Sequence, residues 1–162
     1  TVDALYIREA LEGMAARLAA INRTQEHIVQ LQNLFSVMEQ AQAGQETFEL
    51  YRKGIDVHRL LYAAANNPQL ERIGLNTLEQ ESVFSYRSLL KDDSRSRDMH
   101  EEHKKIAKYV IEQDADRAEE AARFHIHKLI ERLRSAQPNV TFDSPLRGSM
   151  PLLALQHKEP IK

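Results

Sequence analysis

The chain has 162 residues, of which 42% are hydrophobic, so it is long enough for one globular domain with a buried core. Its formal net charge of −2 mixes both signs along the sequence, which excludes the basic surface that a domain gripping DNA by itself needs. It has no cysteine, which excludes disulfides and thiolate metal sites, and no apolar run near the roughly 18 residues that a membrane span requires.

Helix-forming residues dominate all but the end of the chain. Of the five prolines, four lie at or after position 138, and glycine is equally scarce, with five in the whole sequence. Ala, Leu, Glu, Gln, Lys and Arg make up most of the rest, a composition that favours helix. The sequence therefore predicts an all-α fold over residues 1–137, and we expect residues 138–162 to form a flexible tail.

Apolar residues at helical spacing, closed by turn residues, predict about six helices in an antiparallel bundle. They are expected at 2–20, from a cap at Thr24 to Gly44, at 46–65, from Pro68 to a loop at 92–94, at 96–112, and from a cap at Asp114 to 135. Gly74 falls inside the fourth predicted helix, where glycine weakens a helix, so it is expected to mark a kink or a close approach.

Histidines occupy positions where the helical pattern calls for a hydrophobic residue. His58 shares a face with Ile55 and Leu61, and His103 and His125 lie on the apolar faces of the last two predicted helices. Each could be a core imidazole with satisfied nitrogens. Imidazoles that converge from several helices of a bundle are also the usual way to hold a divalent metal there. Spacing alone leaves both interpretations open.

Other polar residues are candidates for contact with a ligand. Arg8 lies on an apolar stripe, where a buried guanidinium needs an anionic partner. Tyr62 could supply a hydroxyl to a pocket, or could be a core tyrosine. Arg97 borders the loop before the fifth predicted helix and could close over an anion, or could be a solvated capping residue. His100 could reach the same face as His103, but its place near the start of the predicted helix favours exposure to solvent. His127, two residues after His125, is expected to point elsewhere.

Several spaced motifs resemble one family. The segment IREALEGMAARLAA followed by Thr24-Gln25-Glu26, the segment HRLLYAAANNPQL from His58, and the segment EEHKKIAKYVIEQDADRAEEAARFHIH resemble the FCD domain of FadR-like regulators in the GntR superfamily. The last segment keeps two equal intervals of eleven residues, from His103 to Asp114 and from Asp114 to His125. The resemblance covers roughly residues 4–135.

The resemblance implies an antiparallel helical bundle that dimerises and binds a small organic acid. It also implies a divalent metal, with Zn, Ni and Mn as candidates, held by an aspartate and by His58, His103 and His125. The aspartate position, four residues before His58, is Gly54 here. Either the metal is absent and Arg8 and the histidines hold the acid, or a site with three histidines and more open positions remains.

The expected function is therefore that of an effector-binding domain in a cytoplasmic bacterial transcription regulator. The first residue is Thr rather than Met, so the chain is expected to be a fragment, with a winged-helix DNA-binding domain missing on its N-terminal side. Two alternatives remain: a hydrolase with a three-histidine metal site, and a helical interaction module. The hydrolase lacks an evident general base, since Glu102 is expected to face about 100° away from His103.

Overall fold

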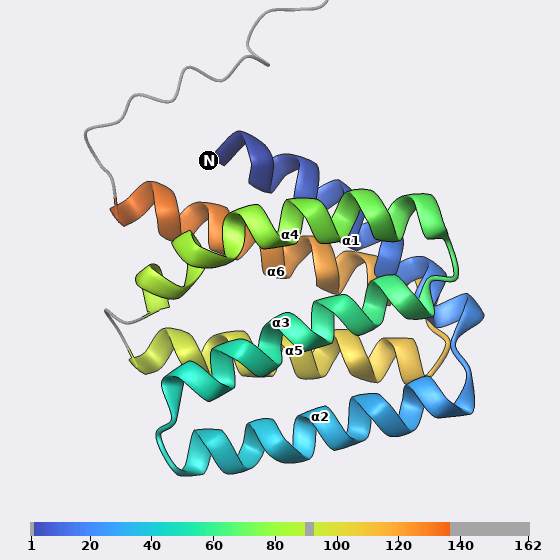
Figure 1. Ribbon diagram of the computed structural model, residues 1–162, viewed down its shortest axis with the longest axis horizontal. Helices are drawn as coiled ribbons and strands as arrows, with labels where there is room; N and C mark the ends of the chain where they lie inside the picture. Colours follow the sequence, from blue (N-terminus) through green and yellow to red (C-terminus); the bar gives the residue numbers. More distant parts are fainter. Residues whose placement is uncertain (1, 90–92, 137–162) are drawn as a thin grey trace, which may run out of the picture.

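The computed structural model describes residues 2–89 and 93–136, which form six helices without any strand (Figure 1). The helices are α1 (Val2–Asn22), α2 (Gln25–Ala43), α3 (Thr47–Ala64), α4 (Pro68–Leu89), α5 (Asp93–Ile111) and α6 (Ala115–Ala136). The predicted all-α bundle is confirmed. The largest boundary error is at α5, which begins at Asp93 rather than at 96. The predicted tail at 138–162 lies outside the described residues.

The predicted caps open two of the helices. The Thr24 side chain accepts a hydrogen bond from the backbone of His27, whose ring accepts one from the backbone of Thr24. At the start of α6, Asp114 accepts from the backbone nitrogen of Arg117 at 3.1 Å. Each cap satisfies backbone donors that a helix leaves unpaired in its first turn, so these residues fix where α2 and α6 begin.

Tight turns connect α2 to α3 and α5 to α6, and each contains a glutamine in the left-handed region. Gln45 has φ 57° and Gln113 has φ 61°. After α5, the backbone nitrogens of Gln113 and Asp114 donate to Val110 and Tyr109, the pattern of a Schellman motif. Glycine usually occupies this position, because a Cβ is unfavourable at positive φ.

Replacing Gln113 with glycine is expected to stabilise the protein by about 0.5 to 1 kcal/mol, because the relief of left-handed strain exceeds the added entropy of the unfolded chain. Urea denaturation measures the effect. Gln32→Gly, an exposed position inside α2, is the matched control and should cost about 1 kcal/mol. Equal destabilisation by both variants would show that Gln113 is unstrained.

Helix α3 occupies the centre of the bundle. It packs against α1, α2, α4 and α5, and α6 lies along both α1 and α5 (Figure 1). The largest apolar cluster joins small and branched side chains of α1, α2, α3, α5 and α6. Consequently a side chain on the inner face of α3 can meet side chains from α1, α5 and α6, which is the arrangement that a site shared by several helices requires.

Gly74 of α4 permits the close approach that the sequence predicted. A Cβ built on Gly74 would lie 2.2 Å from Cε1 and 2.3 Å from Cζ of Tyr62, whose side chain is fully buried. The ring of Tyr62 packs with Ala15 and Ala65, so it has little room to move. Gly74 therefore sets the distance between α3 and α4.

Gly74→Ala is expected to destabilise the protein by about 1 to 3 kcal/mol through overpacking, although alanine is the better helix former by about 1 kcal/mol. Thermal or urea denaturation measures the loss. In a double-mutant cycle, adding Tyr62→Leu should recover part of it, because the smaller side chain frees the space. Strictly additive effects would contradict a direct clash between these residues.

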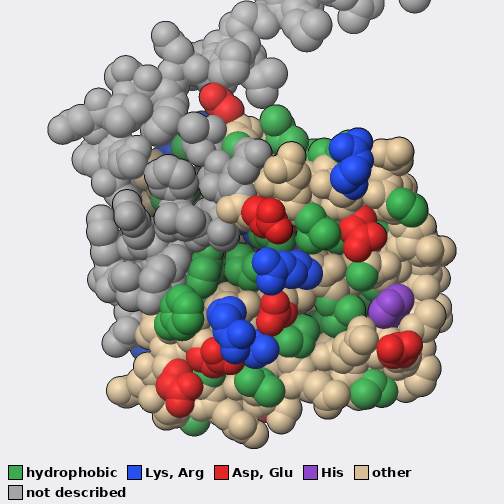
Figure 2. Space-filling model, in the orientation of Figure 1, with side chains coloured by type: hydrophobic (Ala, Val, Ile, Leu, Met, Phe, Trp, Pro, Cys, Tyr) green, Lys and Arg blue, Asp and Glu red, His purple; other side chains and the backbone are tan. Residues whose placement is uncertain are grey.

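Charged side chains of both signs alternate with small apolar groups on the face shown in Figure 2. Charges of opposite sign also pair along α3, where Asp56 lies 3.3 Å from Lys53 and 3.2 Å from Arg59. This mixed face fits the even charge distribution of the sequence. Within residues 2–89 and 93–136, the helices are all too short or too polar to cross a membrane.

Candidate metal and effector site

Three histidines meet between the helices of the bundle. His58 comes from α3, His103 from α5 and His125 from α6, and all three side chains are buried. Their potential ligand atoms lie within 4.8 Å of one another, and the Nε2 atoms of His58 and His103 are 3.0 Å apart. The convergence that the sequence left open is present in the structure.

Two carboxylates contact the outer nitrogens of these rings. Glu12 Oε2, on α1, lies 2.6 Å from Nδ1 of His58, and Glu102 Oε2, on α5, lies 2.7 Å from Nδ1 of His125. A carboxylate at Nδ1 keeps the proton on that nitrogen and leaves the lone pair on Nε2. Most histidines that bind metal donate their other ring nitrogen to a carboxylate, a backbone carbonyl or a water in this way.

Each carboxylate is also paired with an arginine. Arg8 Nε donates to Glu12 Oε1, and both side chains are almost completely buried, at 2% and 1% exposed. Arg132 donates to Glu102 Oε1 at 2.8 Å. The buried stripe on α1 thus contains the anionic partner that a buried Arg8 needs. The charges of the two carboxylates are therefore balanced by those of the two arginines.

Burial and neighbouring charge shift the pKa values around the cluster. Burial opposes ionisation of Glu12, but the charges of Arg8 and His58 outweigh it and lower the pKa of Glu12 to about 2. Burial lowers the pKa of His58 to about 4, although Glu12 opposes the shift. Burial, with His125 and His58 nearby, holds the pKa of His103 well below its usual range. His58 and His103 are therefore neutral near pH 7, the form in which imidazole binds a metal.

The residues present fit a divalent transition metal. Three imidazoles converge, and two of them are oriented by carboxylates. Gly54, one turn before His58, lines the same cavity and contributes no ligand atom. A Cβ there would lie 3.0 Å from Cε1 of His103, so the ring of His103 closely covers the backbone where the family's aspartate is expected. The available donor set is three nitrogens.

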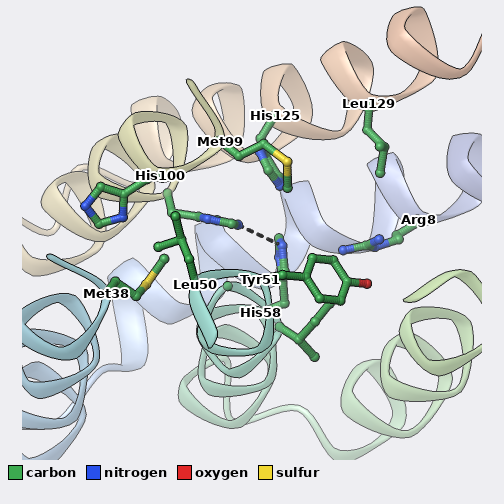
Figure 3. Close-up of a pocket in the computed structure, with 12 residues that line it drawn as sticks. Arg8, Met38, Leu50, Tyr51, His58, Met99, His100, His125 and Leu129 are labelled. Carbon is green, nitrogen blue, oxygen red and sulfur yellow. Dashed lines mark hydrogen bonds between the residues drawn. The ribbon is translucent and has the colours of Figure 1, made fainter. Parts of the chain in front are cut away.

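A cavity adjoins the histidine cluster (Figure 3). Arg8 lines it together with apolar side chains from several helices. The other lining residues are Met38, Leu50, Tyr51, Gly54, Ile55, His58, Met99, His100, His103, His125 and Leu129. In Figure 3, Arg8 and His100 lie on opposite sides of His58 and His125. The cavity combines an apolar wall with a cation and several imidazoles. Its volume of about 30 Å³ holds about one water molecule, so an organic ligand that enters must move apart the side chains and helices that line it.

The other two predicted ligand-contacting residues lie elsewhere. Tyr62 is buried among Ala15, Ala65 and neighbouring leucines and is absent from the cavity lining, although its hydroxyl has no hydrogen-bond partner within the described part of the chain. Arg97 is exposed and lines a separate hollow beside Thr47 and Leu50. The structure therefore brings together Arg8 and the three histidines and leaves Tyr62 and Arg97 outside that group.

Sequence reasoning missed three polar residues of this region. The sequence pattern assigns no role to Glu12. It predicts the direction of Glu102 relative to His103 but not its contact with His125 on the neighbouring helix. His100 was expected to be exposed, but its side chain is buried. The spacing of four residues from Arg8 to Glu12 is a signal that could have identified their ion pair. His127 is exposed, as predicted.

Comparisons with known proteins agree with this architecture. The family model for the FCD domain matches residues 3–128. A relative from Paenarthrobacter nicotinovorans, described as a probable D-xylose utilization operon transcriptional repressor, is 31% identical over 125 residues. The match covers 77% of this chain and 54% of that relative, so the chain spans about half the length of the curated protein it matches.

Solved structures show the same fold at low identity. E. coli McbR/YncC has a TM-score of 0.73 and 19% identity, over 83% of this chain and 67% of that one. Streptococcus agalactiae GntR has a TM-score of 0.67 and 20% identity, over 80% of this chain and 57% of that one. Because the family model spans most of the described residues, the chain belongs to the FCD domain family.

Proposed function

We propose that this chain is the effector-binding and oligomerisation domain of a transcription regulator of the GntR superfamily. Its effector is a small organic acid, bound beside Arg8 at a divalent metal held by His58, His103 and His125. The convergence of these three histidines in a cavity also lined by Arg8 is the observation that carries the proposal. Family membership and the description of the P. nicotinovorans relative support the regulatory role.

The charge balance around the cluster supports an anionic effector. Glu12 is already paired with Arg8, and Glu102 with Arg132. Bound divalent metal therefore adds positive charge that these two carboxylates do not offset, and it supplies a Lewis acid to which a carboxylate can coordinate. Arg8 lines the cavity and adds to the attraction. A carboxylic acid that chelates through an adjacent hydroxyl or keto oxygen satisfies these requirements best.

Ligand binding would act on helix packing. The cavity is lined by residues of α1, α2, α3, α5 and α6, so an acid bound there favours one relative arrangement of these helices. We place the DNA-reading winged-helix domain on the N-terminal side of α1, outside this chain, and the working protein in the bacterial cytoplasm. A change in α1 would then alter how two DNA-reading domains are spaced.

A dimer is part of the proposal. Ile7, Met14 and Ile21 recur every seven residues along α1 and are 58%, 40% and 56% exposed. Such a stripe is suited to a second copy of the chain, because burying it removes apolar surface from water. Sedimentation equilibrium should give twice the mass of the chain, and a monomer at high micromolar concentration would contradict this part of the proposal.

Catalysis is a weaker candidate function. A metal-dependent hydrolase needs a general base beside the attacking water. Of the carboxylates in the described part of the chain, the two that approach the cluster each contact a histidine and an arginine. Both carboxylates therefore orient histidines and balance the charge of an arginine. These contacts favour a site that retains its ligand over one that converts it.

Calorimetric titration of the zinc-loaded chain with a panel of small organic acids tests the proposal. We expect saturable 1:1 binding of at least one hydroxy, keto or sugar acid, and no binding of its neutral amide. The acid should be recovered unchanged, as judged by NMR after prolonged incubation. Conversion of the acid would support the hydrolase, and a chain that binds neither metal nor acid would be a helical interaction module.

A further inference from the structure

His100 of α5 is a buried polar residue beside the histidine cluster. Its side chain is 1% exposed, yet neither Nδ1 nor Nε2 has a hydrogen-bond partner within residues 2–89 and 93–136. It lines the cavity of the histidine cluster but does not belong to the group of three whose ligand atoms converge. Its ring lies near that of Phe35, with centroids 5.9 Å apart.

An unpartnered imidazole in this position has an energetic cost. Burying a polar group without a hydrogen bond destabilises the folded protein, and an aromatic side chain of similar size would avoid that cost. Met38, Leu50 and Met99 line the same cavity and are apolar, so packing alone would be served by a hydrophobic side chain at position 100. The buried imidazole of His100 is therefore better explained by a role in binding than by packing.

The position of His100 indicates what it could bind. It precedes His103 by three residues on α5, so the two rings share a helix face and their Cα atoms are separated by about 4.5 Å of helical rise. His100 and Arg8 lie on opposite sides of His58 and His125 (Figure 3). A ligand with its carboxylate at the cluster therefore meets His100 with a different part of its carbon chain.

The chemistry of the His100 ring indicates which chemical group of a ligand it can bind. Burial, with the positive charge of Lys104 nearby, lowers the pKa of His100, which favours the neutral ring. Neutral imidazole offers one donor and one acceptor nitrogen. An alcohol hydroxyl likewise donates and accepts, whereas a second carboxylate only accepts and a hydrocarbon chain does neither. Hydroxyl groups are thus the match for this ring.

We propose that His100 is a specificity-determining residue that hydrogen-bonds a hydroxyl of the effector remote from its carboxylate. The effector is then a polyhydroxylated acid, such as an aldonic or uronic acid, and not a short monocarboxylate or a fatty acid. This inference rests on the proposed acid-binding function. It adds a contact between His100 and the part of the ligand farthest from the carboxylate.

Matched six-carbon acids test the inference. D-gluconate carries hydroxyls along its chain and hexanoate carries none, while glycolate has only the hydroxyl next to its carboxylate. Affinities of the zinc-supplemented full chain are measured by calorimetry for the wild type, His100→Phe and His100→Gln. We expect the wild type to prefer gluconate to hexanoate. His100→Phe should reduce gluconate affinity by about 10-fold or more, leaving glycolate affinity unchanged, and His100→Gln should retain most of the preference.

A second measurement separates a ligand-binding role from a structural one. If His100 serves the ligand, the ligand-free His100→Phe protein should be at least as stable in urea as the wild type, because it no longer buries an unpaired polar group. A destabilised His100→Phe protein, or equal loss of gluconate and glycolate affinity, would overturn the inference while the acid-binding function stands. If no acid binds the wild type, the proposed function itself fails, and the role of His100 with it.

Discussion

Replacing Glu12 with glutamine is expected to lower the free energy of unfolding by about 3 to 5 kcal/mol. The substitution keeps the shape of the side chain and removes its charge, which leaves Arg8 buried without an anionic partner. Breaking one half of a buried ion pair is costly because the remaining charge has lost both water and its partner. Urea denaturation of the metal-free protein measures the change.

Two further variants test that explanation. Glu9→Gln, on the same helix and only partly buried, should change stability by less than about 0.5 kcal/mol. The double variant Arg8→Met, Glu12→Leu removes both charges and should be far more stable than Glu12→Gln alone, because no buried charge is left unpaired. A Glu12→Gln protein as stable as Glu9→Gln would mean that water reaches Arg8.

His103→Ala is expected to weaken zinc binding by more than about 100-fold. Replacing a group that only orients a metal ligand costs about 10- to 100-fold, and losing one of three ligands should cost more. His103 is chosen because its Nδ1 has no hydrogen-bond partner in the described part of the chain, so removing the ring leaves neither Glu12 nor Glu102 without its histidine. Competition with a chromophoric chelator measures the affinity.

Graded controls accompany this variant. Glu102→Gln should reduce zinc affinity by about 10- to 100-fold, because it loosens His125 without removing a ligand. His127→Ala removes an exposed histidine of α6 and should leave the affinity unchanged. Circular dichroism without metal checks that each variant remains helical. If His103→Ala bound zinc as tightly as the wild type, the proposed three-histidine metal site would be wrong.

The fold and the central histidines could be predicted because both follow from local periodicity. A helix of regular pitch places His58 on the same face as Leu61, so its inward direction is fixed by sequence spacing alone. The close approach at Gly74 could likewise be anticipated from the cost of glycine inside a helix. The sequence could not identify the residue that Gly74 approaches, because that residue, Tyr62, belongs to a different helix.

The errors at the site arise where contacts cross between helices or where a boundary moves. Because α5 begins at Asp93, His100 lies two turns inside the helix, where it meets Phe35 of α2. The spacing of Glu102 predicts a direction about 100° away from His103, and in the structure its carboxylate contacts His125 on α6. Periodicity gives the direction of a side chain but not the residue that it meets.

The missing side chain at Gly54 bears on which metals the protein can select. Carboxylate oxygens suit Mg, Ca and Mn, whereas imidazole nitrogens suit Zn, Ni, Cu and Fe. With glycine at this position, the three converging ligands are all nitrogens. We therefore expect the protein to discriminate against abundant hard cations and to respond to its effector only where a borderline transition metal such as zinc or nickel is supplied. Manganese, which fits a site that includes an aspartate, should be the poorest of the three candidate ions.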